Sequence, residues 1–274
     1  MNAPNRNLLL RVVTALTLLP AVLALLVFGG WAAAILLAFA AGACAFEYAQ
    51  LTAGQLGTSQ VLSVLGAASL PVLATVWPRA FAGPAFWVVA VVFYVAWIDH
   101  LLRQPLADAP TQTAHAVTGC LYGGLGIAPL AALRAGPDGL AWVISALVIT
   151  WANDTCAYFA GRAFGRHKLY PTVSPHKTWE GFAGGFVGSI GGLFVARLVF
   201  PVLRPVDCLV LGVAGGVFGP LGDLCESMLK RSYGAKDSGF LIPGHGGILD
   251  RVDALLFNVP VVYVYVAVLR NALS

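Results

Sequence analysis

The sequence predicts an all-α protein, a polytopic bundle of about nine transmembrane helices, and three observations lead to that prediction. Of the 274 residues, 59% are hydrophobic, only 10% are charged, and the apolar residues gather in long runs. Soluble domains carry about a quarter of their residues as Asp, Glu, Lys or Arg. A chain with so little charge cannot cover itself with a solvated surface, so a lipid environment is expected.

The apolar runs are each close to the ~20 residues that cross a hydrocarbon core of about 30 Å. The expected spans are residues 8–28, 31–51, 59–78, 84–102, 112–134, 139–160, 181–201, 206–229 and 254–273. The first run is too long for the core of a signal peptide and is expected to remain as a span. The fifth contains His115 and the glycine-rich stretch 119–126, so it is the candidate for a broken or re-entrant span.

The basic residues favour one orientation of these spans. With the N-terminus in the cytoplasm, eleven of the 16 Lys and Arg residues lie inside and five lie outside. This agrees with the excess of positive charge in cytoplasmic loops. We therefore expect a multi-pass protein of the inner (cytoplasmic) membrane. The five cysteines lie in apolar stretches without metal-site spacing, so they are expected to be small buried hydrophobes.

The charged residues are concentrated in two windows. Fifteen of the 28 Lys, Arg, Asp and Glu residues fall within 153–181 and 223–253. Two spans separate these windows, so both lie on the cytoplasmic side and can form one site. Counted along the sixth and eighth spans, Asp154 lies roughly 22 Å and Asp223 about 25 Å across the bilayer. Ionisable groups at such depths are costly unless paired, hydrated or metal-bound, so they are functional candidates.

The second window combines three kinds of residue that suit phosphate chemistry. Its four carboxylates, in two pairs spaced three apart, are Asp223, Glu226, Asp250 and Asp253. Hard carboxylate oxygens suit Mg²⁺, which usually joins one or two carboxylates to substrate phosphates. Lys230, Arg231, Lys236 and Arg251 supply donors for phosphate oxygens, and Gly244, Gly246 and Gly247 let the backbone approach an anion. The combination points to phosphoryl or nucleotidyl transfer.

Simpler interpretations apply to some of these residues. Glu226 and Lys230 are four apart and can form an ordinary helix pair. Basic residues can also serve as topological anchors or attract anionic lipid. In the first window, Lys177 and Thr178 precede an expected helix start that can bind phosphate. However, the run from Ser174 is equally a normal way to open a helix, so both interpretations stay open.

The motifs of the two windows resemble those of a known family. The run 227–253 contains S-x-L-K-R, K-D-x-G and P-x-H-G-G-x-x-D-R-x-D in register, and the run 174–181 reads S-P-x-K-T-x-E-G. Together with the pair Asn153 and Asp154, they resemble the signature of the phosphatidate cytidylyltransferases, the CDP-diacylglycerol synthases. The likeness covers roughly the C-terminal half. It suggests a division into N-terminal transmembrane helices, 1–135, and a C-terminal transmembrane catalytic region, 136–274.

The resemblance implies conversion of CTP and phosphatidic acid to CDP-diacylglycerol and pyrophosphate with Mg²⁺, and it leaves room for a second cation. We hypothesise that Asp223 and Asp250 are the primary metal ligands. Further ligands, or groups that hydrogen-bond to the ligands, would be Glu226, Asp253 and Asp154. Phosphate binding and catalysis would fall to Lys177, Lys230, Arg231, Lys236 and Arg251. Further substrate contacts are expected from Ser174, Thr178, Ser227, Asp237, Gly246 and Gly247. His245 can donate to a phosphate oxygen or cap its loop.

The expected partners are CTP, phosphatidic acid and membrane lipid, with a second copy of the chain as a homodimer and no nucleic acid. A secondary transporter also places acids and glycine-rich helices in the membrane, but its ionisable groups would tend toward the midplane and need no lysines. The CDP-alcohol phosphotransferases use membrane-embedded acids as well. Their D-x-x-D-G-x-x-A-R pattern is absent from this sequence.

Overall fold

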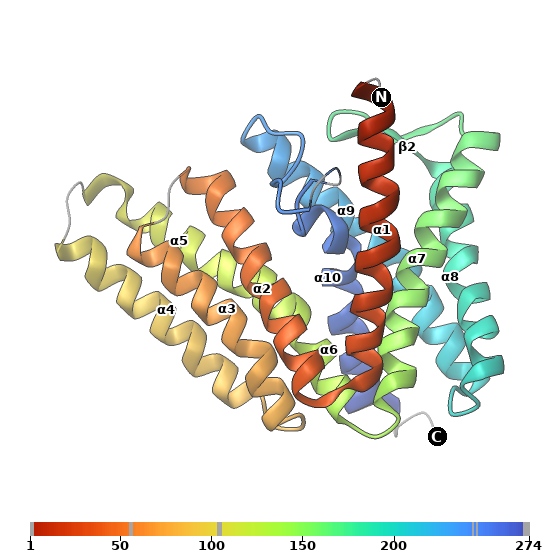
Figure 1. Ribbon diagram of the computed structural model, residues 1–274, viewed down its shortest axis with the longest axis horizontal. Coiled ribbons are helices and arrows are strands. Elements are labelled where there is room, and N and C mark those ends of the chain that lie inside the picture. The colour runs from red at the N-terminus through yellow and green to blue at the C-terminus, as the bar shows by residue number, and fades with distance from the viewer. Residues whose placement is uncertain (1–2, 55–56, 103–105, 243, 245, 271–274) are drawn as a thin grey trace. The chain divides into compact units, whose positions relative to one another are not determined.

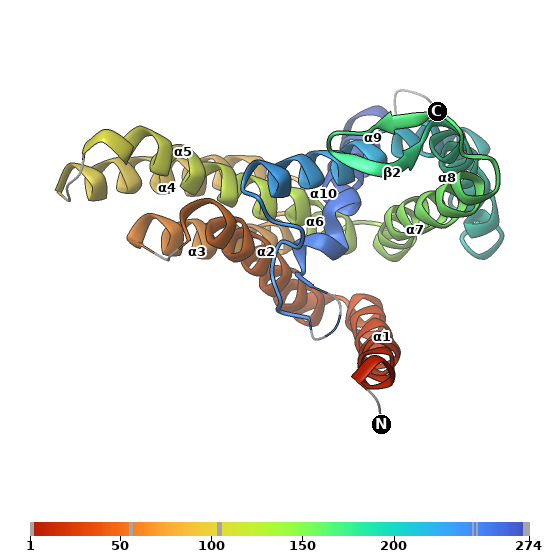
Figure 2. The same ribbon diagram turned by 90° about the horizontal axis from the view of Figure 1, so that it is seen from above.

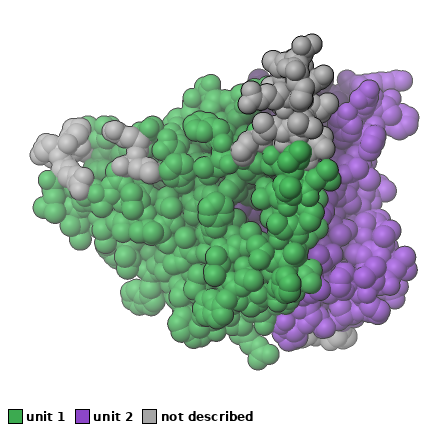
Figure 3. All heavy atoms as spheres, viewed as in Figure 1, with its two compact units in different colours: residues 1–135, 233–252 green, residues 136–232, 253–274 purple. Residues whose placement is uncertain are grey.

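The structure is a computed structural model that describes residues 3–54, 57–102, 106–242, 244 and 246–270, with the backbone alone for residues 3–12, 15 and 106. The chain forms two compact units, coloured separately in Figure 3. Unit 1 comprises residues 1–135 and 233–252, and unit 2 comprises residues 136–232 and 253–274.

Unit 1 is built from apolar helices. In chain order they are α1 (Ala3–Phe28), α2 (Gly30–Ala53), α3 (Thr58–Val76), α4 (Ala82–Leu102), the 3₁₀ turn η1 (Leu106–Asp108), α5 (Ala109–Gly119), the π-helical segment η2 (Cys120–Leu125) and α6 (Gly126–Ala135). Figure 1 shows α2, α3 and α4 side by side. Between α1 and α2 the chain turns at Gly29, whose φ of +71° favours glycine. Arg134 donates to the carbonyl oxygens of Leu26 and Val27 at 2.6 and 2.7 Å, which satisfies the free acceptors at the end of α1.

The fifth expected span is helical throughout. Helix α5, η2 and α6 follow one another without interruption over Ala109–Ala135, so the expected break or re-entrant loop is not found. The glycines serve close packing instead. A Cβ added to Gly123 would lie 2.6 Å from the carbonyl oxygen of Ala41 on α2, and one on Gly124 would lie 2.6 Å from Leu70 on α3.

Unit 2 contains the helices of the C-terminal half. They are α7 (Gly139–Phe164), α8 (Trp179–Val199), α9 (Pro205–Ser232), α10 (Leu249–Val264) and the π-helical segment η3 (Tyr265–Leu269), with the first four residues of α10 belonging to unit 1. Small residues allow α7 and α8 to approach closely. Gly184, Gly188 and Gly192 of α8 face Ala160, Cys156 and Ala152 of α7. The spacing of small residues therefore serves helix packing here.

A two-stranded hairpin connects α7 to α8, which the sequence did not predict (Figure 2). Strand β1 (Lys168–Tyr170) pairs antiparallel with β2 (Ser174–Thr178), with Lys168 opposite Thr178 and Tyr170 opposite Ser174. Helix α8 begins directly after β2. Its N-cap is Thr178, whose Oγ1 accepts the N–H of Gly181 at 3.1 Å. Only Thr178 therefore opens the helix, as its N-cap, whereas Ser174 and the residues up to Lys177 form the strand before it.

Eight helical stretches of the described residues are long and apolar enough to cross a membrane, by length and composition. They correspond to the second to ninth expected spans. In α1 the apolar part with described side chains is the shorter stretch Leu16–Phe28. The last helix begins at Leu249 rather than at residue 254, so Asp250 and Asp253 lie within it. The protein is a multi-pass membrane protein built almost entirely from helices, with one short hairpin.

Candidate functional site

Three acidic side chains of unit 2 form a cluster around one lysine. Asp154 comes from α7, Asp223 from α9 and Asp253 from α10, and we call these three the carboxylate cluster. Their charges act on one another and on the ammonium group of Lys177, which lies on β2. The Nζ atom of Lys177 is 2.6 Å from Oδ2 of Asp223. Three acids therefore interact with one basic group.

Buried polar contacts fix the helices that carry the carboxylate cluster. Beside Asp154, the fully enclosed Asn153 donates to Oγ of Ser189 on α8 at 3.0 Å. On α10, Asn258 donates to Oγ1 of Thr150 on α7 at 2.9 Å. These bonds set how α7 is rotated against its two neighbours, and the position of Asp154 follows from that rotation.

A glycine brings the other two carboxylates to neighbouring positions. Next to Asp223, Gly222 is buried, and a Cβ added there would lie 2.6 Å from the carbonyl oxygen of Asp253. Any larger residue at position 222 would push α9 away from α10. Because Gly222 lets α9 approach α10 closely, the next residue, Asp223, lies beside the segment of α10 that carries Asp253.

The carboxylate cluster is accessible and carries hard oxygen donors. Asp154 is exposed, and the side chains of Asp223 and Lys177 are 34% and 24% exposed. Oγ of Ser227 donates to Oδ1 of Asp223 at 3.3 Å. Within the described ranges, no three His, Cys, Asp or Glu side chains converge to enclose a metal ion. Mg²⁺ needs only one or two protein carboxylates when substrate phosphates complete its shell, so these donors fit that cation.

Glu226 and Lys230 form an ion pair of their own on α9. Their Oε2 and Nζ atoms are 2.5 Å apart at i, i+4 spacing, and the side chain of Glu226 is fully buried. This is the ordinary helix pair considered as the alternative for these residues. Arg231, at the end of the same helix, is exposed.

The remaining predicted residues belong to unit 1, in the segment 233–252. Asp250 accepts hydrogen bonds from the N–H groups of Ser238 and Gly247, each at 2.9 Å, and from Oγ of Ser238. The Gly247 N–H that was expected to face a phosphate thus binds Asp250 in this structure. Gly246 has a φ of +83°. Lys236, Asp237 and Arg251 are exposed, and His245 lies outside the described residues.

Sequence reasoning gave no account of Glu47, an acid inside the second apolar span. In the structure it is 1% exposed and contacts the backbone at the start of α10. Its position within an apolar span could have indicated a role, because a buried acid in a membrane helix requires polar partners.

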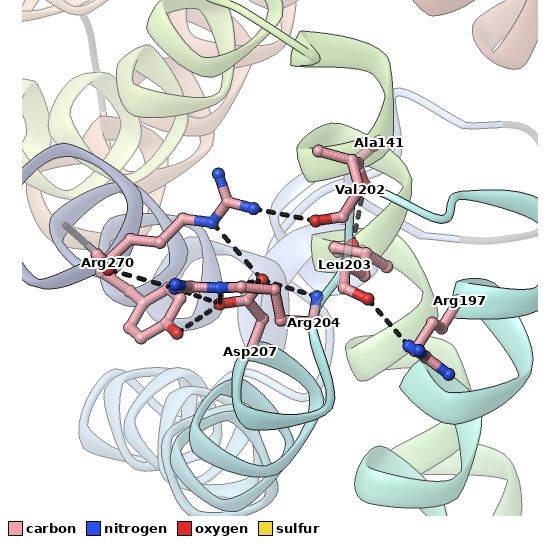
Figure 4. A network of polar contacts seen from close by, with 9 residues as sticks. Ala141, Arg197, Val202, Leu203, Arg204, Asp207 and Arg270 are labelled. Carbon is pink, nitrogen blue, oxygen red and sulfur yellow. Dashed lines mark hydrogen bonds and ion pairs between the residues drawn. The ribbon is translucent and has the colours of Figure 1, made fainter. Parts of the chain in front are cut away.

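A second polar network, shown in Figure 4, lies near the start of α9 in unit 2. Asp207 is fully buried and accepts the hydroxyl of Tyr265 at 2.6 Å, the guanidinium of Arg204 at 2.9 Å and that of Arg270 at 3.4 Å. It also accepts the backbone N–H of Arg204 at 2.8 Å. Arg270 in turn donates to the carbonyl oxygen of Val202 and lies over the ring of Trp142. We call Asp207, Arg204, Tyr265 and Arg270 the Asp207 network.

The sequence was compared with protein families and with known proteins. The sequence matches the cytidylyltransferase family over residues 9–269. It is 47% identical over 130 residues to a phosphatidate cytidylyltransferase of Bacillus subtilis, covering 47% of this chain and 48% of that protein. It is 43% identical over 155 residues to a phosphatidate cytidylyltransferase of Brucella suis, covering 55% of this chain and 56% of that protein.

The aligned part thus spans about half the length of these curated relatives. The family match, in contrast, extends over nearly all the described helices of both units. The chain belongs to the cytidylyltransferase family.

Proposed function

We propose that the protein is a membrane-bound nucleotidyltransferase that converts CTP and phosphatidic acid to CDP-diacylglycerol and pyrophosphate. The observation that carries this proposal is the carboxylate cluster with Lys177. Three acids and one partly exposed lysine suit a cation and a phosphate bound together, whereas a simple anion site would need the bases alone. The names of the relatives and the motifs of the C-terminal half support the same reaction.

The chemistry requires no protein nucleophile. An oxygen of the lipid phosphate monoester forms a bond to the α-phosphorus of CTP, and the bond from that phosphorus to the bridging oxygen of the β-phosphate breaks, so pyrophosphate leaves with the electron pair. The protein's task is to position two anionic reactants in line and to offset their charge. A bound Mg²⁺ would supply part of that charge neutralisation.

Asp223 and Asp253 would hold the divalent cation, and Asp154 would orient it or a water of its shell. Lys177 would donate to a phosphate oxygen, for which its ammonium group is already accessible beside Asp223. Ser227 would fix the rotamer of Asp223 through its hydrogen bond. The sequence-based roles of Asp250, Lys230, Arg231, Lys236 and Arg251 remain predictions, as does a homodimer.

Location follows from the charge distribution. We propose that the site faces the cytoplasm at the inner membrane, where CTP is available and where the lipid phosphate would enter from the cytoplasmic leaflet. Cysteine labelling from either side of oriented vesicles tests the orientation. Labelling of positions next to Asp223 only from outside the cell would contradict it.

Radiolabelled CTP tests the reaction with the purified protein. With phosphatidic acid and Mg²⁺, label from the α-phosphate should enter an organic-soluble CDP-lipid, and label from the γ-phosphate should appear in pyrophosphate. Diacylglycerol, which lacks the phosphate, should give no product, and a chelator should stop the reaction. Transfer of γ-label to lipid, or retention of α-label in the aqueous phase, would overturn the proposal.

A further inference from the structure

The acid Glu47 occupies an unusual position in α2. It lies within a helix that is apolar enough to span the membrane, and its side chain is 1% exposed. Burying an acidic group at such a place is costly unless other groups satisfy it. Among the described residues no Lys or Arg forms an ion pair with it, and its hydrogen-bond partners are neutral donors.

Those donors come from one short segment about 200 residues later in the sequence. Oε1 of Glu47 accepts the N–H of Ile248 at 2.9 Å, and Oε2 accepts the N–H of Leu249 at 2.7 Å. Both amides lie at the N-terminus of α10, where helix N–H groups lack partners within the helix and the helix dipole favours an anion. Glu47 therefore acts as the cap of α10, supplied by another helix of unit 1.

The loop that precedes α10 is fitted around this carboxylate. A Cβ added to Gly239 would lie 2.7 Å from Oε1 of Glu47, and one on Gly247 would lie 2.6 Å from Oε2. Oγ of Ser238 lies 3.2 Å from Glu47 and 2.9 Å from Asp250. Gly247, one of the glycines that the sequence suggested for the approach of a substrate anion, thus accommodates an anion of the protein itself.

We infer that Glu47 is a positioning residue for the proposed reaction, because it holds the first turn of α10 and the glycine-containing loop before it in one conformation. Asp250 lies one residue after Leu249, and Asp253 of the carboxylate cluster lies one turn further along the same helix. Glu47 is not a metal ligand in this arrangement, since both oxygens are engaged by backbone N–H groups. The inference rests on the proposed function for its effect on turnover, but not for its structural part.

Two variants test the role. Glu47→Ala removes both acceptor oxygens, and Glu47→Gln retains one. We expect Glu47→Ala to lower kcat by about 10²-fold, the order of loss that a small misplacement of catalytic groups causes, and to raise the Mg²⁺ concentration for half-maximal rate. KM for CTP should change much less. Glu47→Gln should lie between Glu47→Ala and the wild type.

Hydrogen exchange gives a readout that is independent of turnover. Peptides containing Ile248 and Leu249 should exchange faster in Glu47→Ala than in the wild type, while peptides of α3 should be unchanged. Gln50→Ala, an exposed polar position one turn along α2, should match the wild type in both assays. If Glu47→Ala does not fold, the single variants Glu47→Gln and Ser238→Ala replace it. In both, the peptides containing Ile248 and Leu249 should exchange faster than in the wild type.

The outcomes separate the two proposals. Faster exchange in variants of a protein whose wild type makes no CDP-lipid would refute the proposed function and keep the capping role. Wild-type exchange and wild-type kinetics in Glu47→Ala would overturn the inference. The inference would also be overturned if Glu47→Ala lost activity only in proportion to its loss of folded protein and kept the wild-type Mg²⁺ requirement.

Discussion

Two aspartates of α9, Asp207 and Asp223, lie in the same helix but have opposite surroundings. Asp207 is fully buried, and its one negative charge meets two guanidinium groups and a tyrosine hydroxyl. Asp223 is partly exposed and shares one lysine with two other acids. They are sixteen positions apart, which corresponds to roughly 24 Å along the helix. The Asp207 network is complete without a ligand, whereas the carboxylate cluster has an excess of negative charge that a cation would offset.

The comparison predicts that the same substitution has different consequences at the two positions. Asp223→Asn should lower CDP-lipid formation on the order of 10³-fold, because losing a cation ligand costs several kcal/mol of transition-state stabilisation. The melting temperature in detergent should stay close to that of the wild type. Radiolabel assays and thermal unfolding of the same preparation check both. An Asp223→Asn protein that is folded and fully active with Mg²⁺ would refute the ligand assignment.

Asp207→Asn should mainly affect folding. The change leaves two guanidinium groups without their carboxylate, and removing one partner of a buried ion pair costs about 3 kcal/mol or more. The variant should melt at a clearly lower temperature. At temperatures where it remains folded, its Mg²⁺ requirement should equal that of the wild type. If Asp207→Asn changed the Mg²⁺ requirement and left the stability unchanged, the proposed difference between Asp207 and Asp223 would be wrong.

Lys177→Ala tests the one positive charge of the carboxylate cluster. We expect kcat/KM to fall on the order of 10- to 100-fold, because the donor to a phosphate oxygen is lost. Divalent-cation affinity should rise or stay the same, since less positive charge competes for the three acids. Lys168→Ala, an exposed position on the other strand of the hairpin, is the matched control. Weaker cation binding in Lys177→Ala would contradict this role.

The smallest effect is expected from Ser227→Ala. Its hydroxyl makes one long hydrogen bond of 3.3 Å to Asp223, so its loss should lower turnover only about two- to fivefold. Steady-state kinetics can resolve that difference. Ser232→Ala on the same helix, whose hydroxyl binds the carbonyl oxygen of Met228, should leave turnover unchanged. A loss of activity as large as that of Asp223→Asn would give Ser227 a more direct role.

Local sequence patterns were enough to predict the helices and part of the site. Long apolar runs gave eight spans that the structure contains, because membrane helices satisfy their backbone within themselves. Asp154 and Asp223 were indicated by their depth in the bilayer, and Asp253 by the other charged residues of its window. The structure then showed that they lie together with Lys177.

Other features depend on partners that are distant in sequence. Asp207 is held by Tyr265 and Arg270, which follow it by about 60 residues, and no local pattern links them. The partners of Glu47 are about 200 residues away. Gly247 also has a local signature that fits either a substrate anion or a protein carboxylate. Only the folded chain shows that Glu47 takes that place.

Cation binding tests the central claim most directly. Mn²⁺ as a substitute for Mg²⁺ can be titrated into the purified protein with CTP and followed by electron paramagnetic resonance, for the wild type, Asp223→Asn and Asp207→Asn. The carboxylate cluster as the cation site predicts protein-dependent Mn²⁺ binding that is lost in Asp223→Asn and retained in folded Asp207→Asn. Equal binding by the wild type and Asp223→Asn would contradict it.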